Sequence, residues 1–288
     1  YANDSREVVE FRQDSQNIRE ELAKSEIYDD AAIALSQKKA DWVKSYHVKV
    51  GHGNCSLILA VYGTDYELWV VDCSTYDYLN RGDYSQNLYH CLKDIAGELN
   101  KDLTNLRISR FMLTHTHFDH YNGLGYLIKH GLVDDRTVVY ANLHYDCASP
   151  VWKCILEGLK SVSCKFVEPV YDNQTSGLIN IYHPECRIYK NSSSDENSRV
   201  VPEVNNSSVV YGIVFGGRVM VFPGDLERNG FEEMSGNFPC QGMLCQTDYY
   251  VVSHHGSLNG HPTKPCKSIC SKTPLECISE RIKRTILM

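Results

Sequence analysis

The chain has 288 residues, 42% of them apolar and 23% charged, and its formal net charge is −7. This composition is typical of a soluble globular protein, and the sequence lacks the run of about 18 apolar residues that a membrane-spanning helix needs. The negative charge argues against a protein that coats nucleic acid non-specifically, but not against a nuclease, because bound divalent cations invert the charge locally.

The first 45 residues are polar and charged. Two stretches, 14–24 and 30–40, begin with Asp and carry apolar residues at helical spacing, which predicts two amphipathic helices. We therefore expect an N-terminal helical extension over residues 1–45. It can be an adaptor for a protein partner, a packing arm or a connector, and a solvated extension is the favoured interpretation.

Strand patterns begin at residue 46, and we assign residues 46–288 to one main domain. The expected strands and turns are a strand at 46–50, a glycine turn at 51–54, a strand at 56–62, a hairpin turn at 63–65 and a strand at 67–72. A helix is expected over 84–100, where leucine and isoleucine recur on one face. The third strand ends in Asp72, which makes its carboxylate a candidate for function.

The segment Thr-His-Thr-His-Phe-Asp-His at 114–120 is the most informative of the chain. It lies between a predicted strand at 106–113 and a predicted helix at 122–129. Alternate residues of an extended segment point the same way, so its first two histidines can converge on one ion. The Asp and the last His lie at the turn and can face a second ion. The candidate ligands are His115, His117, Asp119 and His120.

The second half of the chain alternates strand and helix patterns. The expected elements are a strand at 138–141, a helix at 152–161, a strand at 164–168, a surface loop at 184–206, a hairpin at 208–222 and a strand at 249–253. Two strand-rich halves with helices between them predict two facing sheets flanked by helices. The last residues, 284–288, have the pattern of a strand cut short, so we expect the domain to continue.

The chain has twelve cysteines and no signal-peptide pattern at its start. Reduced thiols in a cytoplasmic protein are therefore expected rather than disulfides. Cys266, Cys270 and Cys277 lie near His261, but their spacing matches no strong zinc motif.

Four groups of potential ligands each follow a predicted strand. They are Asp72, the 115–120 segment, Asp225 and the pair His254–His255. Singly, each has an ordinary alternative as a turn residue, a helix cap or a surface pair. Strand ends are rigid and meet at one edge of a sheet, as a metal site requires. Their occurrence together predicts a metal site.

These motifs resemble the metallo-β-lactamase-fold hydrolases over roughly residues 46–260, and the His-x-His-x-Asp-His signature is the most specific of them. The details resemble the hydrolase domain of bacterial DNA-uptake competence proteins. The matching stretches are the Gly-x-Gly turn in 50–54, the strand ending in Asp72, Asn-x-x-Ser at 205–208 before a hairpin ending in Gly224-Asp225, and His-His-Gly-Ser at 254–257. The resemblance implies an α/β fold, a four-layer αββα sandwich.

The resemblance also implies a role for each matching position. His115 and His117 would bind a first divalent ion, Asp119, His120 and His254 would bind a second, and Asp225 would bridge both. His255 would contact the substrate or donate a proton to the leaving group, so that Asp119, Asp225 and His255 form the catalytic set. Asp72 would orient a ligand imidazole, with Asn205 and Ser208 also just outside the ligand set.

One position departs from the wider family. Many members supply a further His about twenty residues before the bridging Asp, whereas residues 205–208 here read Asn-Asn-Ser-Ser. The competence-like branch shares this difference. The first ion would then have two imidazoles and the bridging carboxylate, so its affinity is expected to be lower.

The implied activity is metal-dependent hydrolysis by a metal-activated hydroxide, as a phosphodiesterase or nuclease. Two divalent ions are expected, zinc first and manganese second, because ligands of imidazole and carboxylate without thiolate suit either. The substrate would be a phosphodiester, as nucleic acid or nucleotide, and no membrane partner is expected. Two alternatives remain: an acyl or lactam hydrolase of the same fold, and a catalytically degenerate metal-binding sensor or interaction module.

Overall fold

The structure of the protein is a computed structural model. It describes residues 6–143, 149–169, 178–184, 204–231, 247–257, 259–260, 276–278 and 285–287. Most of the loop predicted at 184–206 and the histidine and first two cysteines of the group at 261–277 lie outside these ranges. Within the described ranges, no helix combines the length and the apolar character that crossing a membrane requires.

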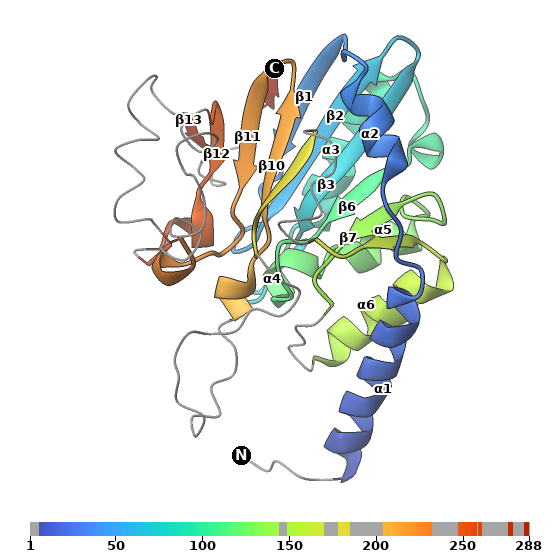
Figure 1. The fold of residues 1–288 in the computed structure, drawn as a ribbon, viewed down its shortest axis with the longest axis vertical. Coiled ribbons are helices and arrows are strands. Elements are labelled where there is room, and N and C mark those ends of the chain that lie inside the picture. The colour runs from blue at the N-terminus through green and yellow to red at the C-terminus, as the bar shows by residue number, and fades with distance from the viewer. Residues whose placement is uncertain are drawn as a thin grey trace.

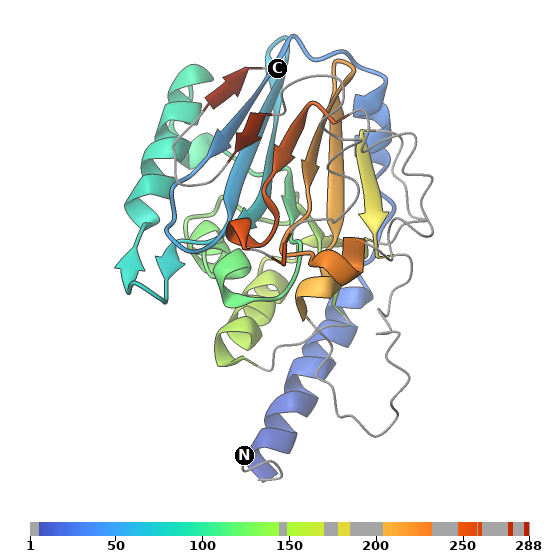
Figure 2. The same ribbon diagram turned by 90° about the vertical axis from the view of Figure 1, so that its left-hand side faces the viewer.

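Two β-sheets form the centre of the molecule (Figures 1 and 2). The first contains β1 (Trp42–His47), β2 (Cys55–Tyr62), β3 (Asp65–Cys73), β6 (Arg110–Met112), β7 (Val138–Tyr140), β8 (Lys165–Val167) and β14 (Thr285–Leu287), in the order β14-β1-β2-β3-β6-β7-β8. The second contains β9 (Ile179–His183), β10 (Val210–Phe215), β11 (Arg218–Phe222), β12 (Tyr249–Val251) and β13 (Glu276–Ile278), in the order β13-β12-β11-β10-β9. A separate small hairpin pairs β4 (Tyr76–Asp77) with β5 (Gly82–Asp83).

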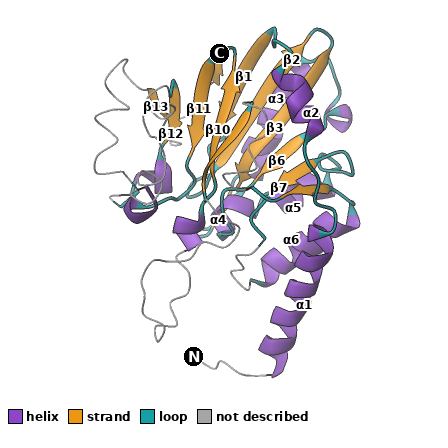
Figure 3. Cartoon of the chain, in the orientation of Figure 1, coloured by secondary structure: helices purple, strands orange, loops and turns teal. Residues whose placement is uncertain are grey.

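Helices cover the outer face of the first sheet (Figure 3). They are α1 (Arg6–Ala23), α3 (Ser85–Glu98), α4 (Phe118–Tyr121), α5 (Leu124–Lys129) and α6 (Pro150–Ser161). The short α2 (Asp30–Ser36) packs at the edge of the space between the sheets. On the outer face of the second sheet, residues 228–231 are helical, and Phe231 packs there with Leu226. The predicted α/β fold with two facing sheets and an N-terminal helix is confirmed.

The alternation of side chains along the central strands divides the core into two layers. Leu57 and Leu59 of β2 face the helices, while Ile58 and Ala60 face the second sheet. Both layers are buried because each strand lies between other elements on both faces. The strand ends that carry the candidate ligands therefore stand on a fixed framework.

The N-terminal segment packs against the main domain rather than extending into solvent. Arg19 of α1 donates a hydrogen bond to the carbonyl of Leu143 at 2.9 Å, and Ala32 of α2 is fully buried. Ile27 donates a backbone hydrogen bond to Phe166 of β8 at 2.8 Å, which covers that end of the sheet. Of the roles considered for this segment, these contacts correspond to the packing arm.

Two predicted strands have different limits in the structure. The first of them is Trp42–His47 in the structure, whereas the sequence predicted residues 46–50. Its first half was missed because Lys44, which pairs with Glu98 of α3, makes this stretch look polar in the sequence. The strand predicted at 106–113 is restricted to Arg110–Met112, since the apolar residues before it are buried in a loop. The hairpin β4–β5 and strand β9 were not predicted.

Candidate metal centre

The candidate ligands lie at the ends of four strands, at the same edge of the two sheets. Asp72 is in the last part of β3, the 115–120 segment follows the parallel strand β6, Asp225 follows β11, and His254–His255 follow the parallel strand β12. Parallel strands end at the same edge, which is why segments far apart in sequence meet here. In Figure 1 this edge is where α4 lies.

One group of ligand atoms consists of His115, His117 and Asp225, whose nearest nitrogen and oxygen atoms all lie within 4.8 Å of one another. Nε2 of His115 is 3.0 Å from Nδ1 of His117 and 3.9 Å from Oδ2 of Asp225. This is the set predicted for the first ion.

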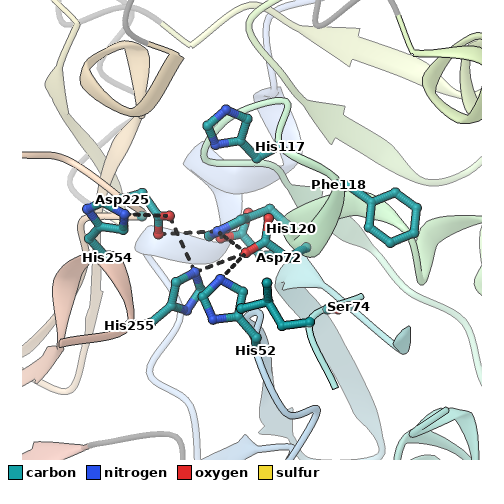
Figure 4. Close-up of polar contacts among 12 residues, drawn as sticks. His52, Asp72, Ser74, His117, Phe118, His120, Asp225, His254 and His255 are labelled. Atoms are coloured by element: carbon teal, nitrogen blue, oxygen red, sulfur yellow. Dashed lines mark hydrogen bonds and ion pairs between the residues drawn. The ribbon is translucent and has the colours of Figure 1, made fainter. Parts of the chain in front are cut away.

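A second group consists of Asp119, His120, Asp225 and His255, again within 4.8 Å. Nε2 of His120 is 3.2 Å from Oδ1 of Asp225, and Nε2 of His255 is 3.1 Å from Oδ2 of Asp119 and 3.3 Å from Oδ2 of Asp225. Asp225 is therefore common to both groups. Figure 4 shows His120, Asp225 and His255 turned towards one another.

The placements of His254 and His255 differ from the sequence expectation. Nε2 of His254 is 4.0 Å from Oδ2 of Asp225, and its Nδ1 faces Oε1 of Glu227 at 3.4 Å. Both histidines have a left-handed backbone, with φ of 49° and 50°. This conformation is uncommon outside glycine and is held by the surrounding structure. It turns the two neighbouring imidazoles so that His255 joins the second group.

Asp72 lies behind the candidate ligands. Its Oδ2 accepts hydrogen bonds from Nδ1 of His120 and from Oγ1 of Thr114, both at 2.8 Å, and its Oδ1 accepts from the backbone N–H of Thr114 at 2.8 Å. The Asp72 backbone is also left-handed, with φ of 53°. A carboxylate on Nδ1 directs the Nε2 lone pair of a histidine outwards, towards an ion.

Asn205 and Ser208 contact other members of the centre. Oγ of Ser208 accepts a hydrogen bond from the backbone N–H of Asp225 at 3.2 Å. Nδ2 of Asn205 donates to Oε1 of Glu227 at 2.9 Å, and Glu227 faces His254. Ser208 therefore fixes the backbone of Asp225, while Asn205 is linked to His254 only through Glu227.

The charges of the centre are strongly coupled. Burial opposes a charge on His120, but the carboxylates of Asp225, Asp72 and Asp119 raise its pKa well above its ordinary value. Burial likewise opposes a charge on Asp225, yet His120 and His255 hold its pKa well below its ordinary value. Burial and the neighbouring His120 lower the pKa of His115. The centre thus combines neutral and cationic imidazoles around buried carboxylates.

These residues fit divalent metal ions. Nε2 of His120 and Oδ1 of Asp225 are buried, and within the described part of the chain neither makes a hydrogen bond of acceptable geometry. Two ligand atoms on one tetrahedral zinc ion lie about 3.3 Å apart. Four separations in the two groups, from 3.0 to 3.9 Å, are close to that value, and the atoms of each group all lie within 4.8 Å of one another.

His52 is a further member of the centre that the sequence indicated only through the Gly-x-Gly turn. Its Nε2 lies 3.4 Å from Oδ2 of Asp119, and its ring centroid is 4.4 Å from that of His255. Gly51 and Gly53 flank it with φ of +76° and +142°. A Cβ at residue 53 would lie 2.7 Å from the carbonyl oxygen of Asp119, so only glycine allows this turn to approach the ligands.

Thr114 and Glu227 were not singled out from the sequence. Thr114 immediately precedes the histidine motif, and this position next to a strand end could have identified it as a residue of the centre. Glu227 has no local signal, because its contact with His254 arises only when β11 and β12 pair.

No protein-family model matches the chain, and no curated protein matches it. Several solved structures are similar. The metallo-beta-lactamase fold protein YhfI from Bacillus subtilis has 16% identity and a TM-score of 0.38, over 73% of this chain and 70% of that one. A diphosphatase from the PhnP family has 13% identity and a TM-score of 0.40, over 80% and 82%. A putative metallo-beta-lactamase from Thermotoga maritima has 10% identity and a TM-score of 0.34, over 64% and 80%.

All three TM-scores are below 0.5. These similarities therefore carry no argument about the function of this chain.

Proposed function

We propose that the protein is a metal-dependent hydrolase of phosphoesters that binds two divalent ions. The observation that carries the proposal is the shared carboxylate: Asp225 belongs to both groups of ligand atoms, one with His115 and His117 and one with Asp119, His120 and His255. A carboxylate common to two such groups is the arrangement of a two-metal hydrolytic site.

The proposed ligands divide between the two ions as the two groups do. His115, His117 and Asp225 would hold the first ion. Asp119, His120, Asp225 and His255 would hold the second. We replace His254 by His255 in the second set, because His255 has the shorter distances to both carboxylates. Bound divalent ions would lower the pKa of a water molecule and stabilise negative charge on the substrate.

The other residues of the centre position these groups. Asp72 holds His120 by its Nδ1 and prevents the ring from turning. Ser208 holds the backbone of Asp225. His52 and His254 border the ligand set, where either can contact a substrate oxygen or donate a proton to a leaving group.

We infer zinc as the first candidate ion and manganese as the second. Zinc suits tetrahedral sets of imidazole and carboxylate, while manganese also accepts these ligands. The substrate class, a phosphodiester, and the relation to competence-protein hydrolase domains stay predictions from sequence, as does the cytoplasmic location.

The proposal is tested by metal content and turnover measured together. The purified protein, loaded with zinc or manganese, is analysed by elemental mass spectrometry and assayed with bis-p-nitrophenyl phosphate. We expect about two ions per chain and measurable turnover. Asp225→Ala should lose metal at both positions and lose turnover, while His115→Ala should lose metal mainly at the first.

A matched control is Asp65→Ala. Asp65 is an exposed carboxylate at the opposite end of β3 from Asp72, so its removal should change neither metal content nor turnover. The proposal would be refuted if the wild-type protein bound no metal. It would also be refuted if Asp225→Ala bound as much metal as the wild type.

A further inference from the structure

An exposed aromatic surface lies at the rim of the metal centre. Within the described part of the chain, five large apolar or aromatic side chains are strongly exposed, and three of them are Tyr76, Tyr78 and Leu79. Single exposed apolar residues are ordinary, but a cluster of them beside a site marks a binding surface. All three belong to the hairpin β4–β5, which no sequence pattern predicted.

The hairpin is fastened to the metal centre by one buried carboxylate. Oδ2 of Asp77 accepts hydrogen bonds from the backbone N–H of His52 at 3.0 Å and from Nδ2 of Asn80 at 2.8 Å. Its Oδ1 accepts from the backbone N–H groups of Leu79 and Asn80, both at 3.0 Å. The tip of the hairpin is thereby held at a constant position relative to His52.

Tyr78 is the hairpin residue whose ring faces His52. Its ring centroid is 5.8 Å from that of His52 and 6.4 Å from that of Phe118, and both contacts are edge-to-face. Neither neighbour stacks face to face on Tyr78, and half of the side chain is exposed. Burial and the carboxylates of Asp119 and Asp77 raise the pKa of Tyr78, so its phenol is neutral at physiological pH. Phe118 lies to one side of the ligands in Figure 4.

Next to His52 is a cavity of about 700 Å³, whose lining includes Asp77, Leu79 and Asn80 of the hairpin but not Tyr78. It reaches the metal centre at His52 and His255, and Leu79, Tyr84 and Asn80 also line it. Lys49 is the only Lys or Arg side chain among the described residues that line it. A volume of this size holds a small molecule rather than a polymer. A single lysine is also too little positive charge for a groove that follows a nucleic-acid backbone.

We infer that the hairpin β4–β5 is the specificity element of the site and that it selects a nucleotide-sized phosphoester, with the nucleobase stacking on Tyr78. This inference rests on the proposed function for the phosphoester itself. With the base on Tyr78, the sugar would lie beside His52 at the mouth of the cavity, where a lining that is apolar at Leu79 and Tyr84 but polar at Asn80 and Lys49 suits a sugar better than an alkyl chain. Every nucleobase can stack on an aromatic ring, so Tyr78 would not select one base over another.

The test compares two esters with the same leaving group and the same scissile bond. They are thymidine 5′-(p-nitrophenyl phosphate) and methyl p-nitrophenyl phosphate, so that only the nucleoside differs. For Tyr78→Ala we expect the ratio of kcat/KM between the thymidine and methyl esters to fall about 10-fold, the loss of one stacked base. Tyr78→Phe keeps the ring and should restore most of the ratio.

Tyr28→Ala is the matched control, because Tyr28 is a similarly exposed tyrosine that lies outside the hairpin and the cavity. In Tyr28→Ala, the ratio of kcat/KM between the thymidine and methyl esters should equal that of the wild type. An unchanged ratio in Tyr78→Ala would overturn the inference. So would a wild-type preference for long single-stranded DNA over the thymidine ester.

A binding measurement separates this inference from the proposed hydrolysis. Thymidine 5′-monophosphate is titrated into the metal-loaded wild type and into Tyr78→Ala by calorimetry. Weaker binding by the variant, with no turnover of either ester by the wild type, would reject the hydrolase and keep the hairpin as a nucleotide-binding element. Equal binding by both proteins, or binding by neither, would overturn the hairpin inference whatever the turnover.

Discussion

Nδ1 of His120 lies 2.8 Å from Oδ2 of Asp72, and this contact directs Nε2 of the same ring at Asp225, 3.2 Å away. Asp72 lies in β3 and His120 in α4, so the contact joins two segments that meet only at the edge of the sheet. The orientation of one imidazole is thus decided by a residue that would itself touch no ion.

Asp72→Asn tests this orientation. An amide has one acceptor oxygen, so it cannot accept both from the backbone N–H of Thr114, which donates to Oδ1, and from Nδ1 of His120, which donates to Oδ2. His120 should then lose its fixed ring position. We expect about a 10- to 100-fold weaker affinity for zinc, the usual cost of losing such a partner. Competition with a chelating dye measures the affinity. Asp65→Asn, at the other end of the same strand, serves as the control, and equal affinities in the two variants would contradict the role of Asp72.

The exchanged placements of His254 and His255 lead to a second prediction. We expect His255→Ala to lose one ion per chain, because His255 is within 3.3 Å of both Asp119 and Asp225. His254→Ala should keep both ions and reduce turnover instead, since its imidazole lies farther away and faces Glu227. Elemental analysis of the two variants distinguishes these outcomes, and the opposite result would restore His254 as the ligand.

The pH dependence of stability should differ between metal-free and metal-loaded protein. Burial opposes a charge on His255, but Asp119 and Asp225 raise its pKa to about 9 in the metal-free centre. A raised histidine pKa contributes stability that is complete below the unfolded pKa of about 6.5 and is lost as the pH rises through about 9. For the metal-free protein we therefore expect the stabilisation by protonated His255 to be lost between about pH 6.5 and about pH 9, which lowers the Tm over this range.

Metal binding reverses the sign of this effect. An imidazole must be neutral to bind an ion, so metal affinity rises as the pH rises and binding releases protons. The difference in Tm between loaded and metal-free protein should widen between about pH 6 and about pH 9. Thermal melts with zinc and with a chelator measure it. A difference that narrows with pH would indicate that these imidazoles do not bind the metal.

A buried ion pair between the N-terminal segment and the first sheet gives a stability prediction. The guanidinium of Arg110 donates to Asp29 at 2.8 and 3.1 Å and to Glu67, and Tyr140 also donates to Asp29 at 2.8 Å. Asp29→Ala leaves Arg110 buried without this partner, which should cost about 3–5 kcal/mol of unfolding free energy. Urea denaturation measures the loss.

Asp14→Ala is the control for that experiment. Asp14 pairs with Lys153 at 3.0 Å but is largely exposed, and exposed pairs contribute little. Its unfolding free energy should match that of the wild type. If Asp29→Ala were as stable as this control, the N-terminal segment would not be an energetic part of the fold.

Local pattern was enough to predict the class of fold and to single out most of the side chains that the structure brings together. The apolar runs of β2 and β3 can be read from the sequence because both faces of these strands are buried. The segment 114–120 carries four of the candidate ligands within six consecutive residues, so their proximity needs no tertiary structure. Asp72 and Asp225 were found for a related reason, since each lies at the end of a recognisable strand.

The tertiary structure decided which of two adjacent histidines faces the ligands. The left-handed backbone at His254 and His255 turns their imidazoles, and Gly224, whose carbonyl accepts from the N–H of His254 at 3.1 Å, lies in another segment. The approach of His52 and the position of Tyr78 likewise depend on Asp77, which joins the glycine turn to the hairpin. Strand periodicity is local and can be read from sequence, whereas these orientations arise from hydrogen bonds between distant segments that exist only once the sheets have assembled.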